Sequence, residues 1–162
     1  MKLKILSSIV LIALITIMIF GVVNIRQQGA ELVREADRFN VPVIQDLMTN
    51  LSSWKYKNIQ SYLNKNFIKS LSEDEFQKEL DNLSALGEVK KLKHIRHVRH
   101  GRYDHWLFSS CAVNKYSVST DFENDSAVVV INLNQCYEKV SVTNFQIHSK
   151  LISRKNPPKS AY

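Results

Sequence analysis

Residues 111–136 have the sequence CAVNKYSVSTDFENDSAVVVINLNQC, in which two strand patterns flank one polar turn. Before the turn, apolar or β-branched residues alternate with polar residues from Tyr116 to Phe122. After the turn, a run rich in valine extends from Ala127 to Leu133. Alternation with a period of two is typical of a half-buried strand, and two such runs around a short polar turn predict an antiparallel hairpin.

The two cysteines of the chain, Cys111 and Cys136, lie on either side of this turn. A two-residue loop at Glu123–Asn124 pairs them directly, whereas a loop at Asn124–Asp125, with better turn chemistry, makes them diagonal neighbours. Both registers bring the thiols close, and two lone cysteines tend to pair in an oxidising compartment. We therefore expect a structural disulfide and no catalytic cysteine. Two buried free thiols are the alternative.

Two more segments have strand patterns, residues 89–98 before the hairpin and residues 140–152 after it. The first half of the hairpin extends back to Trp106, as one long strand or as two joined by an irregularity. From the second half, the side chains expected in the core include Val128, Val130 and Leu133.

Helical patterns occupy the chain before residue 88. Apolar residues recur at helical spacing over residues 27–39 and again over residues 43–51, with an interruption predicted at Asn40–Pro42 because proline favours the first turn of a new helix. Ser72–Glu75 has the sequence of a capping box, and Gly87 is a natural helix stop. Helices followed by antiparallel strands predict an α+β fold, with helices packed on a curved sheet of about four strands.

Residues 5–23 form a run of nineteen residues without a charge, preceded by Lys2 and Lys4. As a helix this run is about 28 Å long, close to the hydrocarbon thickness of a bilayer. Basic residues before a first apolar segment favour a cytoplasmic N-terminus. A cleaved signal peptide is the main alternative, but its apolar core is shorter and ends in small residues. A buried helix of a soluble protein is the second alternative.

These observations predict a single-pass protein of the inner or plasma membrane. Its parts are residues 1–4 in the cytoplasm, residues 5–23 as a signal anchor in lipid, residues 24–39 as a juxtamembrane helix or linker, residues 40–152 as an extracytoplasmic α+β domain, and residues 153–162 as a disordered basic tail. The domain is periplasmic if the source is Gram-negative.

The formal net charge is +7, in a chain that is 44% hydrophobic and 23% charged. This composition excludes disordered, collagen-like and low-complexity classes. Part of the positive charge lies on one predicted strand, at Lys90, Lys91, Lys93, Arg96, Arg99 and Arg102. Beyond a membrane we expect no nucleic-acid partner. An anionic membrane surface, an acidic protein or an acidic polymer fits this basic surface better, and a solvated strand face is the alternative.

Three histidines, His94, His97 and His100, recur at intervals of three. On a helix this spacing stacks them and allows a metal site, but on a strand His94 and His100 share one face and His97 takes the other. A three-histidine site on a strand therefore needs a bulge, and the arginines between these residues oppose metal binding. We expect no metal ion and no cofactor, and the three histidines are weak candidates for metal ligands.

Several segments within about residues 40–152 form a further pattern, namely Pro42–Trp54, Tyr62–Leu63, Phe67, Ser70–Ser72, Glu75–Phe76, Leu86–Gly87, Tyr116–Asn124, Ala127–Val130 and Phe145–Ser149. Together they resemble extracytoplasmic domains of the nuclear-transport-factor-2-like superfamily. Relatives often have a turn and a tryptophan before the last strand, where this chain has Gln135–Val140. The resemblance implies a cone with a mouth between sheet and helices.

Some members of that superfamily are enzymes, such as ketosteroid isomerases and scytalone dehydratases. Many membrane-anchored members are non-catalytic, including assembly subunits of type IV secretion machines. Fold alone does not choose between them.

We therefore expect a membrane-anchored binding or assembly module that is not an enzyme, with an unidentified protein or a second copy of the chain as partner. A small pocket enzyme of the isomerase or dehydratase type is the alternative, and its nearest candidate residues are Tyr103, Asp104, His105 and Tyr116. Asp104–His105 is predicted to lie in a solvated turn. Metal or anion binding by the histidine- and arginine-rich strand is the second alternative.

Overall fold

The computed structural model describes residues 2–70, 72–105 and 109–155. Side chains are described for residues 16–18, 20–24, 27–69, 72–101 and 111–153. The chain divides into two compact units, Met1–Ala36 and Asp37–Tyr162. The boundary lies within helix α1 (Lys2–Leu51), and all the strands belong to the second unit.

The first unit consists of the N-terminal part of α1. Four of its large apolar side chains are more than half exposed, namely Ile17, Met18, Phe20 and Val22. Where side chains are described, no helix is long and apolar enough to cross a membrane. Residues 5–15 of the predicted anchor lie outside that set.

The predicted break at Asn40–Pro42 is wrong, because α1 continues through Pro42 to Leu51. A proline inside a helix removes one backbone hydrogen bond and crowds the carbonyl four residues earlier, which costs about 3 kcal/mol. The next two turns offset this cost, since each large apolar side chain buried there contributes about 1.5–3 kcal/mol. The side chains of these turns that are at most 1% exposed are Ile44, Leu47, Met48 and Leu51.

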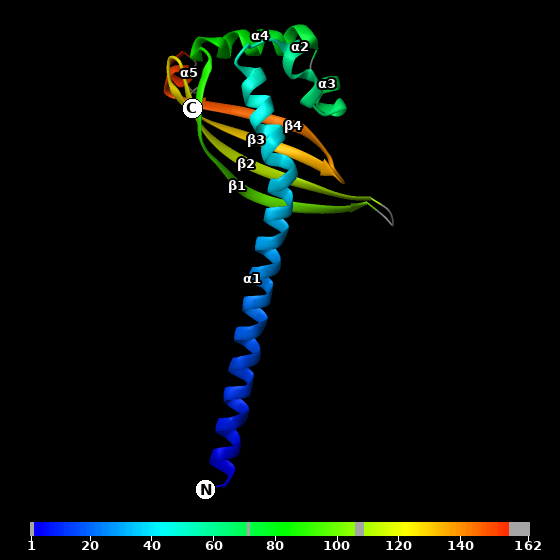
Figure 1. Ribbon diagram of the computed structural model, residues 1–162, viewed down its shortest axis with the longest axis vertical. Coiled ribbons are helices and arrows are strands. Elements are labelled where there is room, and N and C mark those ends of the chain that lie inside the picture. Colours follow the sequence, from blue (N-terminus) through cyan, green and yellow to red (C-terminus); the bar gives the residue numbers. More distant parts are fainter. Residues whose placement is uncertain (1, 71, 106–108, 156–162) are drawn as a thin grey trace, which may run out of the picture. The chain divides into compact units, whose positions relative to one another are not determined.

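The second unit is α+β, as predicted, with one four-stranded antiparallel sheet in the order β1-β2-β3-β4. The strands are β1 (Val89–His105), β2 (Ser109–Phe122), β3 (Ser126–Cys136) and β4 (Lys139–Ser149). Figure 1 shows them side by side in chain order. Strand β1 is longer than predicted, so that Asp104 and His105 pair with Ser110 and Ser109 rather than forming a turn.

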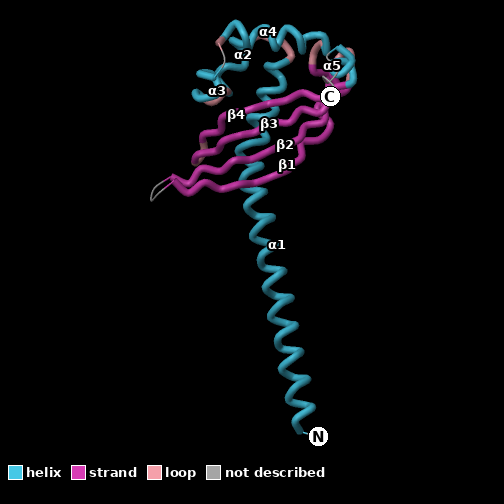
Figure 2. The backbone as a smooth tube through the Cα atoms, turned by 180° about the vertical axis from the view of Figure 1, so that it is seen from behind, coloured by secondary structure: helices cyan, strands magenta, loops and turns pink. Residues whose placement is uncertain are grey.

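Short helices gather on the β4 side of the sheet, as both views show (Figures 1 and 2). They are α2 (Tyr56–Ile59), α3 (Lys65–Ser70) and α4 (Glu73–Leu83), with 3-10 turns η1 (Gln60–Tyr62) and η2 (Ser84–Leu86). The predicted capping box is confirmed, since the Ser72 hydroxyl accepts from the Glu75 amide and the Glu75 carboxylate accepts from the Ser72 amide. Gly87 ends this region with φ 78°, and a Cβ there would lie 2.7 Å from Glu123 Cβ.

The last strand ends earlier than predicted, and helix α5 (Lys150–Lys155) follows it. Residues 153–155 are therefore helical rather than part of a disordered tail, and residues 156–162 lie outside the described chain. The helix begins there because side chains satisfy its first amides. The Asp125 carboxylate accepts from the Leu151 amide at 2.9 Å, and the Ser149 hydroxyl accepts from the Ile152 amide at 3.0 Å.

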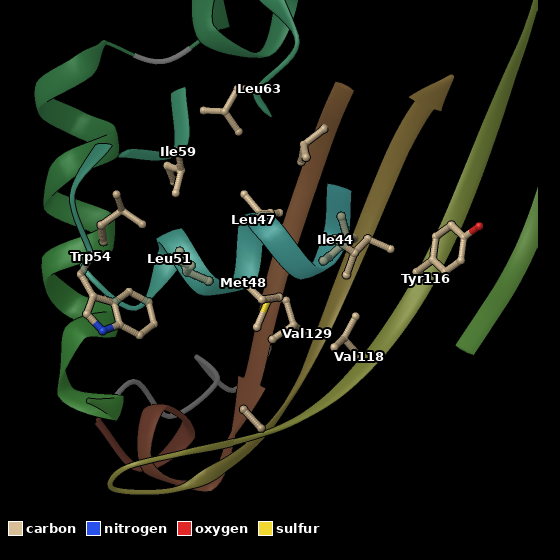
Figure 3. Close-up of a cluster of buried hydrophobic side chains, with 14 of the residues drawn as sticks. Ile44, Leu47, Met48, Leu51, Trp54, Ile59, Leu63, Tyr116, Val118 and Val129 are labelled. Atoms are coloured by element: carbon tan, nitrogen blue, oxygen red, sulfur yellow. The ribbon is translucent and has the colours of Figure 1, made fainter. Parts of the chain in front are cut away.

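The core lies between α1 and the face of the sheet that we call the inner face; the opposite face is the outer face. Figure 3 shows Ile44 and Met48 on the side of α1 that faces Val118 and Val129. The buried residues of β2–β4 on this face include Tyr116, Val118, Val129, Ile131, Leu133 and Val142. Leu133 is buried as expected, but Val128 is 40% exposed and Val130 only half-buried, because the register places odd-numbered residues of β3 inward.

The substitution Pro42→Ala tests the continuous helix. It restores the missing backbone hydrogen bond and loses only the smaller restriction that proline places on the unfolded chain. We expect the free energy of unfolding to rise by about 1–2 kcal/mol in urea titrations. The exposed neighbour substitution Gln45→Ala is the control, with a change below about 0.5 kcal/mol. A loss of stability in Pro42→Ala would contradict a helix that runs through this residue.

Candidate functional site

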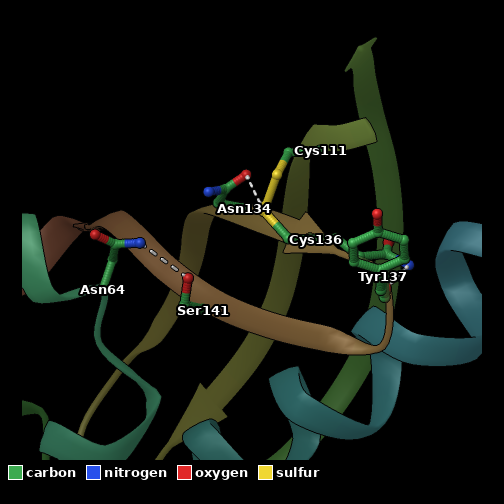
Figure 4. The surroundings of a disulfide bond; sticks show 7 residues. Asn64, Cys111, Asn134, Cys136, Tyr137 and Ser141 are labelled. Carbon is green, nitrogen blue, oxygen red and sulfur yellow. Dashed lines mark hydrogen bonds between the residues drawn. A yellow bond between two sulfur atoms is a disulfide. The ribbon is translucent and has the colours of Figure 1, made fainter. Parts of the chain in front are cut away.

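The two cysteines form the predicted disulfide. Cys111 and Cys136 are directly opposed in the β2–β3 register, with Cα atoms 4.3 Å apart. The two-residue loop at Glu123–Asn124 is therefore the correct alternative, and the Phe122 amide donates to the Asp125 carbonyl at 2.9 Å across it. Figure 4 shows the bond near the β3–β4 turn that contains Tyr137. It lies on the outer face, because strand alternation separates Cys111 from the inward Tyr116.

A polar cluster interrupts the apolar inner face around Tyr116, which is fully buried. The Tyr116 hydroxyl donates to Asp37 Oδ1 at 2.8 Å and accepts from Asn40 Nδ2 at 3.2 Å. Asp37 and Asn40 are one turn apart on α1, so both reach the same strand position. Asn40 Nδ2 also donates to Gln135 Oε1 at 3.2 Å. Burial, followed by the hydrogen bond to Asp37, raises the pKa of Tyr116 far above its ordinary value.

Two histidines of β1 join this cluster through Asn114, which is fully buried. Asn114 Oδ1 lies 2.7 Å from His100 Nδ1 and 3.3 Å from His97 Nε2. The amide oxygen can only accept, so in this arrangement each ring donates an N–H. The His97 ring also lies against Tyr116, with centroids 4.9 Å apart.

The expectation that His97 and His100 lie on opposite faces is wrong. Strand β1 has a register shift between His97 and Arg99, and the extra residue turns His100 to the same side as His97. His94 is opposite Ser119, exposed on the outer face, so the bulge gathers two of the three histidines. Within the described part of the chain, no group of three or more histidine, cysteine or acidic residues could hold a metal ion.

The cluster thus contains a carboxylate, a phenol, two imidazoles and three amides, most of them bonded to one another. Among the described buried polar side-chain atoms of the cluster, Asn40 Oδ1 lacks a hydrogen-bond partner. Such a network holds α1 in one position on the sheet, because each group left unpaired there would cost about 1–3 kcal/mol. Since Tyr116 is closed off from solvent, the cluster favours a structural role over proton transfer to a substrate.

Of the four residues considered for catalysis, Tyr116 has a described side chain, and it lies in this cluster. Tyr103, Asp104 and His105 lie on β1, and their side chains are outside the described set. Sequence patterns did not predict four residues of the cluster, namely Asp37, Asn40, Asn114 and Gln135. For Asn114 the sequence did contain a signal. This residue lies two residues from Tyr116 on the same predicted strand, so both side chains point to the same face of the sheet.

The outer face of β1 and β2 is strongly basic. The exposed cations that point outward from it are Lys91, Lys93, Arg96, Arg99 and Lys115. Lys93 Nζ lies 2.7 Å from Asp121 Oδ1, and this contact, together with the Ser126 hydroxyl, lowers the pKa of Asp121. Of the other predicted basic residues, Lys90 pairs with Glu88 at 3.1 Å, and the side chain of Arg102 is not described.

An open groove of about 660 Å³ adjoins this basic face at Lys93. It lies over the ends of β2–β4 that meet α5. The lining residues include Lys93, Ser119, Asp121, Val128, His148 and Lys150. Exposed Val128 supplies an apolar part of the lining, and Lys93 and Lys150 supply positive charge. Such a site suits a ligand with an apolar part and a negative charge.

No family model matches the chain, and no curated protein or solved structure matches it either. The superfamily resemblance therefore stays a prediction.

The substitution Tyr116→Phe removes the hydroxyl at the centre of the cluster. We expect the free energy of unfolding to fall by about 1–3 kcal/mol, because Asp37 and Asn40 lose a buried partner. In the wild type the unfolded chain releases the tyrosine proton near pH 10 while the folded chain keeps it, so stability falls as the pH rises above about 10. This loss of stability at alkaline pH should be smaller in Tyr116→Phe. Urea titrations between about pH 8 and 11, on either side of the ordinary tyrosine pKa of about 10, measure it.

The matched control is Tyr137→Phe, the same chemical change on a ring that is 67% exposed. It should change the unfolding free energy at neutral pH by less than about 0.5 kcal/mol. Equal losses in the two variants would contradict the central role of Tyr116.

The disulfide predicts that the native and the denatured chain take up no alkylating reagent until they are reduced. The double variant Cys111→Ser/Cys136→Ser should lose about 3 kcal/mol of stability, because the bond closes a loop with a sequence separation of 25. Mass spectrometry measures the alkylation, and urea titration measures the stability. Reduced wild-type protein is the control and should match the double variant. Alkylation of unreduced protein would contradict the bond.

Proposed function

We propose that the chain is a single-pass, membrane-anchored module whose extracytoplasmic domain binds or assembles with a partner protein and performs no chemistry. The tether is supported by the nineteen uncharged residues 5–23 after Lys2 and Lys4. Exposed apolar side chains at residues 17, 18, 20 and 22 support it further, because a bilayer would cover them. The disulfide supports an oxidising compartment for the domain.

The observation that carries the non-catalytic part of the proposal is the filled inner face. On a nuclear-transport-factor-2-like cone, which we propose for this domain, a substrate would lie between the sheet and the helices. Here Ile44, Met48 and Trp54 occupy that space and are at most 7% exposed. Trp54 is held in place by its indole N–H, which donates to the Gly87 carbonyl at 2.9 Å. An interior filled by the chain itself leaves the surface for recognition.

A pocket enzyme of the isomerase or dehydratase type is the second candidate, and the cluster around Tyr116 is the observation that favours it. A phenol that is hydrogen-bonded to a carboxylate and lies against a tilted imidazole ring is a usable set of acid and base groups. The complete burial of Tyr116 weighs against it, since a substrate would have to displace α1 to reach the hydroxyl.

Membrane attachment is tested on the full-length chain with a C-terminal epitope tag, expressed in a Gram-negative host. We expect the chain to stay in the membrane after alkaline carbonate extraction, and protease added to spheroplasts should remove the tag. The variant Ile12→Arg/Ile15→Arg should weaken insertion, because both residues lie near the centre of the uncharged run 5–23 and each arginine near a helix centre costs about 2.5–3.5 kcal/mol. Leu32→Arg, outside residues 5–23, is the control.

A chain recovered from the soluble fraction, or a mature N-terminus near Asn24, would contradict the tether. Assembly is tested separately, by light scattering on the protein extracted in mild detergent from its own cells. We expect a protein mass above the 18.7 kDa of one chain. A mass of one chain would contradict assembly and leave the tether standing.

A further inference from the structure

We propose that the outer face of β1 and β2 binds an extended acidic polypeptide segment, with an apolar residue of that segment seated in the groove beside Val128. This inference rests on the proposed function, because it names the partner chemistry of the same binding module.

The first observation is the direction of the β1 side chains. Regular alternation cannot point Lys91, His94, Arg96 and Arg99 to one side, since their numbers differ in parity. Strand β1 has register shifts between Leu92 and His94 and between His97 and Arg99. Each shift adds one residue, so the side chains that follow it point to the opposite face from the one that regular alternation would give them. As a result, four outward positions of β1 that have a partner on β2 are all basic, and they lie opposite Asp121, Ser119, Ser117 and Lys115.

The second observation is that this charge is poorly compensated. Arg99 and Lys115 are directly opposed, and like charges at opposed positions destabilise a sheet. Among the described side chains of this face, the acidic one is Asp121, and it is already bonded to Lys93 and Ser126. Across the described side chains, Arg96, Arg99 and Lys115 have no ion pair. An anionic partner would neutralise these cations, so charge complementarity specifies the partner.

The spacing favours a polypeptide over a lipid surface. Outward residues of a strand repeat at about 7 Å, and carboxylates at every second residue of an extended segment repeat at the same distance. The outward basic residues of β1 also adjoin the groove at Lys93, where Val128 is 40% exposed. An apolar side chain next to the acidic residues fits this recess, whereas a flat headgroup layer would span it.

The contact is made by side chains on the face of the sheet. Strand addition at the free edge of β1 would need a regular row of backbone groups, and three register shifts interrupt that row. The partner segment therefore lies across the outer face, with its carboxylates on the cations and its backbone free of the β1 ladder.

The experiment uses the full-length chain in phosphatidylcholine nanodiscs and a fluorescein-labelled peptide of alternating glutamate and serine that ends in two leucines. We expect saturable binding by fluorescence anisotropy, which weakens as salt rises because exposed charges are screened. Arg96→Gln/Arg99→Gln should weaken binding about tenfold. The control Lys57→Gln/Lys78→Gln removes the same charge from exposed positions on α2 and α4 and should bind like the wild type.

Two further comparisons test the details. A peptide with glutamine in place of glutamate should not bind. Val128→Ser should weaken binding of the leucine-ended peptide and leave a peptide without the leucines unaffected. A cooperative urea unfolding transition with a midpoint like that of the wild type shows that each variant is folded.

No peptide binding, or equal loss in the control variant, overturns the proposal. A second set of results would overturn the proposal in favour of a membrane surface. In that case the protein in nanodiscs floats with phosphatidylglycerol vesicles, Arg96→Gln/Arg99→Gln abolishes the flotation, and no peptide binds. None of these outcomes changes the carbonate extraction or the assembly mass, so failure here is distinguishable from failure of the proposed function.

Discussion

The second unit depends on one contact, the burial of the last turns of α1 against the inner face of the sheet. A single antiparallel sheet has one apolar face that must be covered, and α1 covers it with Ile44, Met48 and Leu51. The gain from these side chains explains why the helix persists through Pro42 despite the missing hydrogen bond. Because the cover belongs to the same chain, the interior of this unit is closed.

The irregular strand β1 follows from the same constraint. It is an edge strand, so it must place Leu92 and Ile95 against the core and keep its charges in water. Its sequence does not alternate regularly, and the register shifts reconcile the two demands. The shifts have two consequences. His97 and His100 meet on the inner face, and the lysines and arginines line up on the outer face.

The polar cluster and the apolar core share the inner face but differ in what they specify. Apolar packing between α1 and the sheet would tolerate small shifts of the helix along the inner face, because dispersion contacts have little directionality. The bonds from Tyr116 to Asp37 and Asn40 are directional and bridge 79 and 76 residues of sequence. We infer that the core supplies most of the stability and the cluster sets the position of the helix.

The sequence by itself determined the α+β class, the β2–β3 hairpin, the capping box at Ser72 and the proximity of Cys111 to Cys136. These features depend on residues close along the chain or on a period of two, which are visible without coordinates. Tertiary structure decided the continuous helix at Pro42, the start of α5 at Lys150, where Asp125 accepts from the Leu151 amide, and the position of His97 and His100 on one face. The physical reason is that each depends on a partner from another element: an apolar sheet that offsets a broken hydrogen bond, a carboxylate from a distant turn, or a neighbouring strand whose register creates a bulge.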